Sequence, residues 1–283
     1  MDVSIATAIS QAAQKLRAHG VNQARLEAGL LLSHILGRDR AYLIAHDDRA
    51  LSAGESQTFG TFVARRAAGE PLQYITGHQE FFKRDFEVTP DVLIPRPETE
   101  LIVEAVLGLF PGSVDFTFAD VGTGSGCIAI SILGERQNAR ATAIDKSGEA
   151  LSVAEKNAGR HQVIDRMRLA QSDLFHSLAQ DDLFDLIVSN PPYIPDGDLS
   201  ALQREVQREP QSALAGGADG LDVIRRLLDE SPTHLSACGY LVFEFGINQD
   251  EAIVELVAGA SWELIELRRD LQQIPRTITL RKK

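Results

Sequence analysis

A run of alternating glycines follows an apolar stretch at residues 116–121 and is the first feature that could do chemistry: Gly122-Thr123-Gly124-Ser125-Gly126. Glycines at such a point allow a tight turn and let the backbone approach a ligand, because they have no Cβ. Asp145 ends the next apolar stretch, where a carboxylate can accept hydrogen bonds from both hydroxyls of a ribose. Together these residues indicate a site for a nucleoside cofactor.

The charge beside this turn narrows the choice of cofactor. The glycines depart from the G-x-G-x-x-G spacing of dinucleotide sites, and the acidic Asp120 precedes them. An aspartate near the turn would repel a pyrophosphate and would suit a cation. S-adenosylmethionine carries a positive sulfonium and a positive ammonium, so the pattern favours this cofactor. A turn with a purely structural role is the alternative.

A second group of residues, Asn190-Pro191-Pro192-Tyr193, directly follows the apolar run at 186–189. Consecutive prolines remove two backbone N–H donors and stiffen the chain, which leaves the carbonyl oxygens of the turn as acceptors. A planar NH2 group could place its two hydrogens on the Asn190 side chain and the Pro191 carbonyl, with the Tyr193 ring over its plane. We therefore predict catalytic roles for Asn190, Pro191 and Tyr193. The alternative is a rigid turn after a strand, with a buried tyrosine.

Strands and helices that alternate after residue 98 would position both groups. Apolar, β-rich runs lie at 116–121, 141–145, 167–170, 186–189 and 240–245, and helical patterns lie at 126–136, 147–159 and 219–236. This alternation predicts an α/β fold: a doubly wound, mostly parallel sheet covered by helices on both faces. Later runs at 262–267 and 277–280 would complete the sheet. In such sheets ligands bind at the carboxyl ends of the strands, where both groups lie.

The N-terminal part differs, because its apolar residues recur at helical spacing in several short segments. A helical domain is therefore expected over residues 1–70. Because a sheet with its own cofactor turn should not need these residues to bind a small molecule, we predict that they recognise the substrate. Residues 71–97 lose the helical period and form a predicted linker: a hairpin at 80–88 with residues 83–85 in its turn, then a run with two prolines. The cofactor-binding domain is expected over residues 98–283.

The composition is that of a globular protein, with 44% hydrophobic and 24% charged residues among 283. A net charge of −12 argues against a broad nucleic-acid surface, which needs a basic patch. Two cysteines are too few for a disulfide framework or a zinc cage, and the histidines show no metal-ligand spacing, so no metal site is expected. No apolar run approaches the ~18 residues that span a bilayer, and the first residues lack a secretory signal. We expect a cytoplasmic protein that does not bind membranes.

Both groups of residues resemble known motifs. Asp120 to Gly126 with Asp145 is similar to the first two motifs of class I S-adenosylmethionine-dependent methyltransferases. Asn190 to Tyr193 resembles the motif of those enzymes that methylate planar nitrogens, in adenine, cytosine or glutamine. Three further features reduce the number of families that fit: the run Leu93 to Glu100, the helical N-terminal part and the Ile194-Pro195 that follows the second motif. Over essentially its whole length the chain is similar to the peptide chain release factor N(5)-glutamine methyltransferases.

This resemblance implies a helical N-terminal domain, a hairpin linker and a seven-stranded methyltransferase domain. It implies methyl transfer from S-adenosylmethionine to the glutamine in the Gly-Gly-Gln loop of class I release factors. Matching positions imply cofactor-binding roles for Gly122, Thr123, Gly124, Ser125, Gly126, Asp145, Asp173, Leu174 and Asn190. In this matching, Asp145 binds the ribose, and Asp173 and Leu174 lie beside the adenine ring. The same matching implies that Asn190, Pro191, Pro192 and Tyr193 bind the target glutamine.

Two other functions stay open from the sequence. An adenine N6-methyltransferase of nucleic acids would suit the same pocket, because the exocyclic amine of adenine is also a planar NH2 group. The net charge and the absence of a basic, aromatic-rich region count against it. A module that binds the cofactor and docks release factors without modifying them is the non-enzymatic alternative. Glu244 ends a strand near the expected site, with either a structural role or a role in supporting that site.

Overall fold

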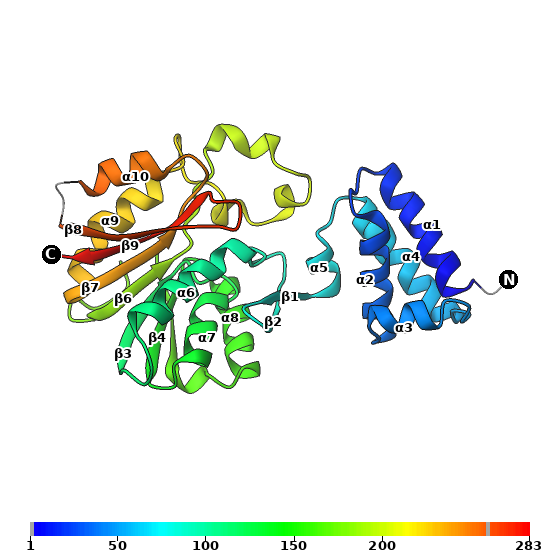
Figure 1. Cartoon of the computed structure of the whole chain (residues 1–283), viewed down its shortest axis with the longest axis horizontal. Coiled ribbons are helices and arrows are strands. Elements are labelled where there is room, and N and C mark those ends of the chain that lie inside the picture. The colour runs from blue at the N-terminus through cyan, green and yellow to red at the C-terminus, as the bar shows by residue number, and fades with distance from the viewer. Residues whose placement is uncertain (1–2, 259–260) are drawn as a thin grey trace. The chain divides into compact units, whose positions relative to one another are not determined.

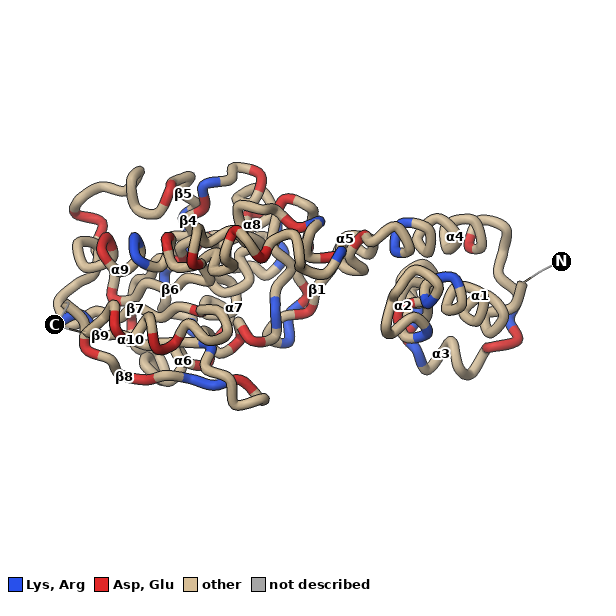
Figure 2. The backbone as a smooth tube through the Cα atoms, turned by 90° about the horizontal axis from the view of Figure 1, so that it is seen from above, with Lys and Arg blue, Asp and Glu red and all other residues tan. Residues whose placement is uncertain are grey.

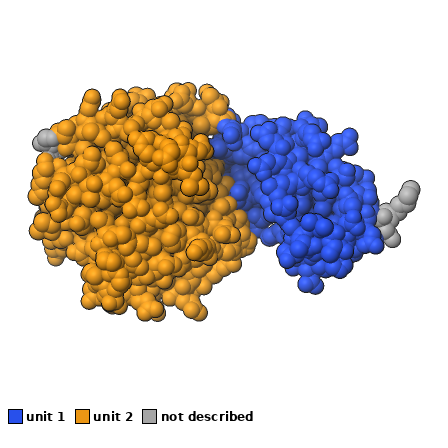
Figure 3. All heavy atoms as spheres, in the orientation of Figure 1, with its two compact units in different colours: residues 1–77, 203–208 blue, residues 78–202, 209–283 orange. Residues whose placement is uncertain are grey.

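The structure is a computed structural model that describes residues 3–258 and 261–283, so the first two residues of the expected helical domain lie outside it. The chain forms two compact units, blue and orange in Figure 3: a smaller unit of residues 1–77 and 203–208, and a larger unit of residues 78–202 and 209–283. The segment that we expected as a linker therefore divides between the two units after Gly77.

Helices build the smaller unit: α1 (Ile5–Ala18), α2 (Ala24–Leu36), α3 (Arg40–Ala45), α4 (Ala53–Ala67) and α5 (Leu72–Thr76) (Figure 1). Helix α4 begins with a capping box, in which the Ser52 hydroxyl accepts from the N–H of Glu55 and the Glu55 carboxylate accepts from the N–H of Ser52. Ile5 and Leu16 belong to the apolar stripe of α1 and are fully buried in a core that α1, α2 and α4 share. This unit thus has its own core.

A short segment from much later in the sequence completes the smaller unit. The guanidinium of Arg66, on α4, is buried and forms ion pairs with Glu27 on α2 and with Glu205 of the 203–208 segment. The distance from Arg66 Nη2 to Glu205 Oε1 is 2.6 Å. The segment follows the Asn190–Tyr193 motif in the chain, so the loop that carries the motif continues into the smaller unit. Local sequence patterns carry no signal for such an insertion.

A seven-stranded sheet forms the centre of the larger unit, with strand order β5-β4-β3-β6-β7-β9-β8. Its strands are β3 (Phe116–Val121), β4 (Ala139–Asp145), β5 (Met167–Gln171), β6 (Phe184–Ser189), β7 (Leu235–Glu244), β8 (Trp262–Arg269) and β9 (Pro275–Lys282). Strands β3 to β7 are parallel, whereas β9 is antiparallel to both of its neighbours, β7 and β8. The predicted mostly parallel sheet is confirmed, and the two C-terminal runs complete it.

Helices cover both faces of this sheet, as Figure 1 shows. One buried cluster contains residues of α6 (Glu100–Leu109), α7 (Cys127–Glu135) and α8 (Gly148–Arg160), and another contains residues of α9 (Asp222–His234) and α10 (Asp250–Val257). Phe118 of β3 belongs to the first cluster and Ala119 to the second, because successive side chains of a strand point to opposite faces. Helix α10 was not predicted, since eight residues are too few for the helical period to show clearly.

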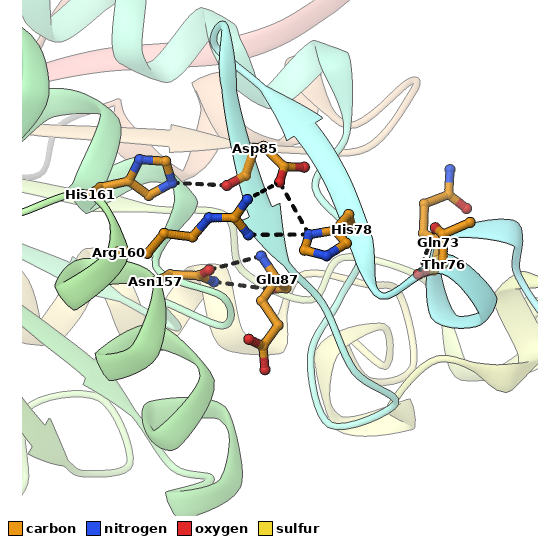
Figure 4. Close-up of polar contacts among 8 residues, drawn as sticks. All are labelled: Gln73, Thr76, His78, Asp85, Glu87, Asn157, Arg160 and His161. Carbon is orange, nitrogen blue, oxygen red and sulfur yellow. Dashed lines mark hydrogen bonds and ion pairs between the residues drawn. The ribbon is translucent and has the colours of Figure 1, made fainter. Parts of the chain in front are cut away.

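A two-stranded hairpin, β1 (His78–Phe81) and β2 (Arg84–Glu87), packs on α8 within the larger unit. Figure 4 shows the contacts. The side-chain amide of Asn157 accepts from the N–H of Glu87 at 2.8 Å and donates to the carbonyl of the same residue at 3.0 Å. Arg160 forms an ion pair with Asp85 at 2.5 Å. The hairpin is therefore held to α8 by side chains as well as by its apolar residues.

The hairpin turn differs from the sequence prediction. We predicted residues 83–85 in the turn, but it contains Phe82 and Lys83, with φ of +47° and +60°. Two consecutive positive φ values are typical of the two-residue turn whose twist matches that of the strands. The N–H of Phe82 donates to Glu100 Oε1 at 2.8 Å, and its side chain packs against the core. Tertiary contacts thus select an apolar residue for a turn position that sequence rules assign to polar ones.

Short 3-10 helices connect the larger elements: η1 (Pro97–Thr99), η2 (Ile164–Arg166), η3 (Asp196–Ala201), η4 (Val206–Arg208) and η5 (Gln211–Ala213). Within the described ranges, none of the helices combines the length and the apolar character needed to cross a bilayer. Figure 2 shows basic and acidic residues interspersed along the backbone.

Candidate active site

A cavity opens at the carboxyl ends of β3, β4 and β6 and brings the two sequence groups together within the larger unit. The predicted site residues that line it are Gly122, Thr123, Gly124, Ser125, Asp145, Asp173, Leu174, Asn190, Pro191 and Pro192. Gly126 and Tyr193 do not line the cavity and pack against neighbouring structure instead. The cavity therefore joins the proposed cofactor residues to the proposed glutamine residues.

The glycine turn forms where β3 ends and α7 begins. The N–H of Gly122 donates to the Ile144 carbonyl on β4 at 2.8 Å, which holds the turn to the neighbouring strand. Gly124 has φ of +53°, and a Cβ built on it would meet no atom within 4 Å, so space is open beside this backbone. A Cβ on Gly126 would lie 2.9 Å from Ile130 Cδ1. The turn thus leaves room for a ligand at Gly124 and allows close helix packing at Gly126.

Asp145 lines the cavity from the end of β4, and its carboxylate is held by the backbone. Oδ2 accepts from the N–H of Gly124 at 2.9 Å, and Oδ1 accepts from the N–H of Ser147 at 3.0 Å. Each carboxylate oxygen has a further lone pair. The side chain is therefore oriented before a ligand binds, and it retains capacity to accept hydrogen bonds from one.

Asp120 lies beneath the glycine turn and does not line the cavity. Its Oδ2 accepts from the Thr123 hydroxyl at 2.7 Å and from the N–H of Ala129 at 3.2 Å. Burial raises the pKa of this carboxyl from 3.8 to about 7, although both hydrogen bonds oppose the shift. The sequence interpretation gave Asp120 an electrostatic effect on the cofactor. Its observed contacts are with the turn and the start of α7.

The raised pKa of Asp120 predicts a pH-dependent contribution to stability. The unfolded chain ionises this carboxyl near pH 4, whereas the folded protein keeps it protonated up to about pH 7. Stability from this group is therefore lost as the pH rises from about 4 to about 7, and is constant above. The difference in unfolding free energy between the parent and Asp120→Asn should fall by roughly 3 kcal/mol from pH 5 to pH 8.

Urea unfolding measured by tryptophan fluorescence tests this expectation, because the single tryptophan, Trp262, is buried in the larger unit. The asparagine variant does not titrate at this position, so the other groups of the protein cancel in the comparison. A difference that stays constant over this pH range would contradict the assignment.

Residues 173 and 174 follow β5. Leu174 is buried, has φ of +50° and lines the cavity with an aliphatic side chain. The exposed Asp173 forms an ion pair with Arg226 of α9 at 3.1 Å, and Arg226 also lines the cavity. Arg226 was not predicted as a site residue, because an arginine on an amphipathic helix looks like any other solvated residue.

Two buried polar side chains, Thr99 and Glu244, link both ends of the Asn190–Tyr193 motif in a chain of hydrogen bonds. Asn190 Nδ2 donates to Thr99 Oγ1 at 3.0 Å, and Thr99 Oγ1 donates to Glu244 Oε2 at 2.6 Å. The hydroxyl of Tyr193 donates to Glu244 Oε1 at 3.0 Å. Burial raises the pKa of the Glu244 carboxyl, and the two hydroxyl donors and nearby Arg276 oppose that shift. Thr99 belongs to the Leu93–Glu100 run, but its residue type and place in the sequence indicate no role by themselves.

Tyr193, whose ring we expect to lie over the substrate plane, is not among the residues that line the cavity. Its hydroxyl is occupied by Glu244, and a Cβ built on Gly246 would lie 3.1 Å from Tyr193 Cδ2. The Tyr193 carbonyl accepts from Gln249 Nε2 at 3.0 Å. A Cβ on Gly216 would lie 2.8 Å from the Pro192 carbonyl oxygen. Close packing thus holds the motif, and Gly216 is a supporting position that no sequence pattern revealed.

A buried carboxylate secures the proline-containing run beside the cavity. Glu209, 4% exposed, accepts from the N–H of Ile94 at 3.0 Å and forms an ion pair with Arg96. Thr99, Pro95 and Arg96 line the cavity together with the motif residues. The run that we read as part of a linker therefore forms a wall of the candidate site.

Comparisons with known proteins agree with this arrangement. Residues 7–77 match the family model of the PrmC N-terminal domain, and residues 99–226 match that of the methyltransferase small domain. Among solved structures, the hMettl16 catalytic domain in complex with the MAT2A 3'UTR hairpin 6 has a TM-score of 0.56 at 14% identity and covers 82% of this chain and 84% of its own. A methyltransferase from Pyrococcus furiosus has a TM-score of 0.53 at 18% identity, with 77% and 96% covered. These similarities show the fold.

Two curated relatives extend over most of the sequence. The release factor glutamine methyltransferase of Koribacter versatilis is 42% identical over 281 residues, which cover 99% of each chain. That of Geobacter sulfurreducens is 47% identical over 236 residues, which cover 83% of this chain and 81% of the relative. Identity at this level over both units shows common descent of the whole chain. The protein belongs to the family of release factor glutamine methyltransferases.

Proposed function

We propose that this protein transfers a methyl group from S-adenosylmethionine to the side-chain amide nitrogen of the glutamine in the Gly-Gly-Gln loop of class I peptide chain release factors. The observation that carries the proposal is a single cavity lined by the glycine turn, by Asp145 and by the Asn190-Pro191-Pro192 turn. Family membership supports the same substrate. The reaction is proposed for the cytoplasm, where release factors act on ribosomes.

Three observations fit S-adenosylmethionine to this cavity. The open space beside Gly124 admits a ligand close to the backbone. The Asp145 carboxylate is oriented by two N–H donors and can accept from ribose hydroxyls. The buried Leu174 offers an apolar surface for a ring. We propose that these residues hold the cofactor, which supplies an activated methyl group on a positive sulfur.

The residues of the second motif would then hold the acceptor. An amide nitrogen is a poor nucleophile because its lone pair is delocalised. The Asn190 side-chain oxygen and the Pro191 carbonyl can accept its two hydrogens, fix the amide plane and stabilise positive charge that develops on nitrogen. Orientation of this kind lowers a barrier by roughly 7–11 kcal/mol. The nitrogen becomes acidic once methylated, so its proton can pass to water without a dedicated base.

Mass spectrometry of a release factor after incubation with the protein and S-adenosylmethionine tests the proposal. A mass gain of one methyl group is expected on the peptide that contains Gly-Gly-Gln, with fragmentation placing it on the glutamine side chain. Incubation with adenine-containing DNA and RNA in parallel tests the nucleic-acid alternative. A protein that binds both cofactor and release factor but transfers no methyl group would contradict the enzymatic role.

Replacement of Asp145 by asparagine should weaken S-adenosylmethionine binding about ten- to a hundredfold. The change removes one charged acceptor, which is worth roughly 1.5–3 kcal/mol, and it turns an NH2 group toward the N–H of either Gly124 or Ser147. Calorimetric titration measures the affinity, and circular dichroism shows whether the variant is folded. Unchanged affinity in a folded variant would contradict the assignment of Asp145.

A further inference from the structure

We propose that Glu244 and Thr99 are positioning residues that determine which atom of the Asn190 side chain faces the substrate amide. The inference rests on the function proposed above and concerns the acceptor side of the cavity. The Asn190 amide can present either its oxygen or its NH2 group, which have nearly the same shape and opposite hydrogen-bonding capacity. Only the oxygen can accept a hydrogen from a glutamine NH2 group.

The direction of the hydrogen-bond chain follows from the carboxylate at its end. The Thr99 and Tyr193 hydroxyls both donate to Glu244, at 2.6 and 3.0 Å. These two donors oppose the rise in pKa that burial causes, and they favour the ionised carboxylate, which only accepts hydrogen bonds. Thr99 has a single hydroxyl proton, and its oxygen is left as an acceptor. Asn190 must then offer its NH2 group, and Nδ2 donates to Thr99 at 3.0 Å. The Asn190 oxygen is thereby left for a ligand.

Burial of Thr99 and Glu244 makes it costly for the Asn190 amide to turn over. Glu244, the last residue of β7, is 1% exposed, and Thr99, the last residue of η1, is 2% exposed. Water cannot replace their hydrogen bonds, and rotation of the Asn190 amide would put two acceptor oxygens face to face. Among the described residues, Glu244 has no ion-pair partner within salt-bridge distance. A carboxylate buried at this cost is typical of a functional site.

The same carboxylate ties together both ends of the motif. One oxygen reaches Asn190 through Thr99, and the other binds Tyr193 directly. The Asn190–Tyr193 turn is therefore anchored at its first and last residues by a single group on β7. Loss of that group would free both ends of the turn.

The direction of the hydrogen bonds from Asn190 to Glu244 also predicts a preference for glutamine over glutamate as substrate. With its oxygen toward the substrate, Asn190 accepts from the NH2 group of glutamine and repels the carboxylate of a glutamate of nearly the same shape. A site built to bind one hydrogen-bonding group rejects an analogue that lacks it, because a polar group is left without a partner. The reverse orientation of Asn190 would reverse this preference.

Thr99→Val tests the role of these hydrogen bonds, because it removes the hydroxyl and keeps the shape of the side chain. We expect the single-turnover rate of release factor methylation at saturating cofactor to fall about 10- to 100-fold, since one positioning hydrogen bond in a buried site is lost. The dissociation constant of S-adenosylmethionine should change less than about threefold, which a general loss of structure would not allow. Thr99→Ser restores the hydroxyl and should restore most of the rate.

Thr279→Val is the matched control. Thr279 lies on β9, is 1% exposed and has a buried hydroxyl without a hydrogen-bond partner, so the same substitution there removes no contact. Its rate should equal that of the parent. Glu244→Gln serves as a second variant: it keeps the volume but can donate as well as accept, so it no longer imposes a direction and should slow the rate about tenfold.

A binding measurement separates orientation from structure. The ligand is a release factor whose loop glutamine is replaced by glutamate. The parent should bind it at least about tenfold more weakly than the unmodified factor, and this ratio should shrink in Thr99→Val and Glu244→Gln, in which Asn190 can turn its NH2 group outward. Melting temperatures of all variants are measured in parallel.

Three results would overturn the proposal: a Thr99→Val rate within about threefold of Thr279→Val, an equal loss in Thr99→Ser, or an unchanged glutamine-to-glutamate binding ratio in both test variants. A parent protein that binds S-adenosylmethionine and leaves the release factor unmethylated would instead contradict the function proposed above. The two failures are therefore distinct.

Discussion

Replacement of Asn190 by alanine should slow single-turnover glutamine methylation roughly 100- to 1000-fold at saturating cofactor. The expectation follows from the loss of one preorganised polar contact to the reacting group, which has an effect of this size in other active sites. Without the Asn190 oxygen, the substrate amide would be free to rotate away from the methyl group. Cofactor affinity should change much less, because we assign most of its contacts to the glycine turn and Asp145.

Asn190→Asp is the informative partner of this variant. It keeps the shape and an acceptor, but it has no N–H to donate to Thr99, whose own proton is directed at Glu244. Its negative charge would also stabilise a cationic cofactor in the ground state more than in the transition state, where that charge disperses. We expect activity between that of alanine and that of the parent.

Rapid-quench measurement of single-turnover rates, with cofactor and release factor both saturating, gives the comparison directly. Calorimetric titration of S-adenosylmethionine supplies the control for cofactor binding. An alanine variant within about threefold of the parent rate would show that the Asn190–Tyr193 turn is only a scaffold.

Deletion of residues 1–76, the helical part of the smaller unit, should reduce kcat/KM for an intact release factor by about 30-fold or more. We propose that these helices recognise the protein substrate, and loss of even one dominant binding contact costs about 2 kcal/mol or more. The larger unit has two buried clusters of its own and contains the whole cavity, so it should fold and bind cofactor without the helices.

A short peptide that contains Gly-Gly-Gln is the control for this deletion. The peptide is too short to use a second surface, so the full-length and shortened proteins should methylate it at similar rates. Equal loss on peptide and on intact factor would indicate damage to the site, because the deletion also removes Arg66, the partner of Glu205 in the 203–208 segment. Full activity on the intact factor would contradict the recognition role, and aggregation would indicate a stabilising role.

The sequence by itself determined the architecture and the two motifs. Alternating apolar runs and helical patterns are local signals, and they predicted the doubly wound sheet and its seven strands. Both motifs lie directly after apolar runs, so their place at the carboxyl ends of β3 and β6 followed from the rule that parallel strands share an edge. Gly124 and Asn190 could be singled out because their residue types are unusual where they stand.

Only the tertiary structure decided which side chains support those motifs. Thr99, Asn190 and Glu244 come from three separate parts of the chain, and their hydrogen bonds depend on side-chain direction and burial, which no local spacing encodes. The same holds for the ion pairs of Glu209 with Arg96 and of Glu205 with Arg66. Each joins residues more than a hundred positions apart in the sequence. Periodicity reports which face of an element is buried; the partner of a buried polar group is set by the packing of elements against one another.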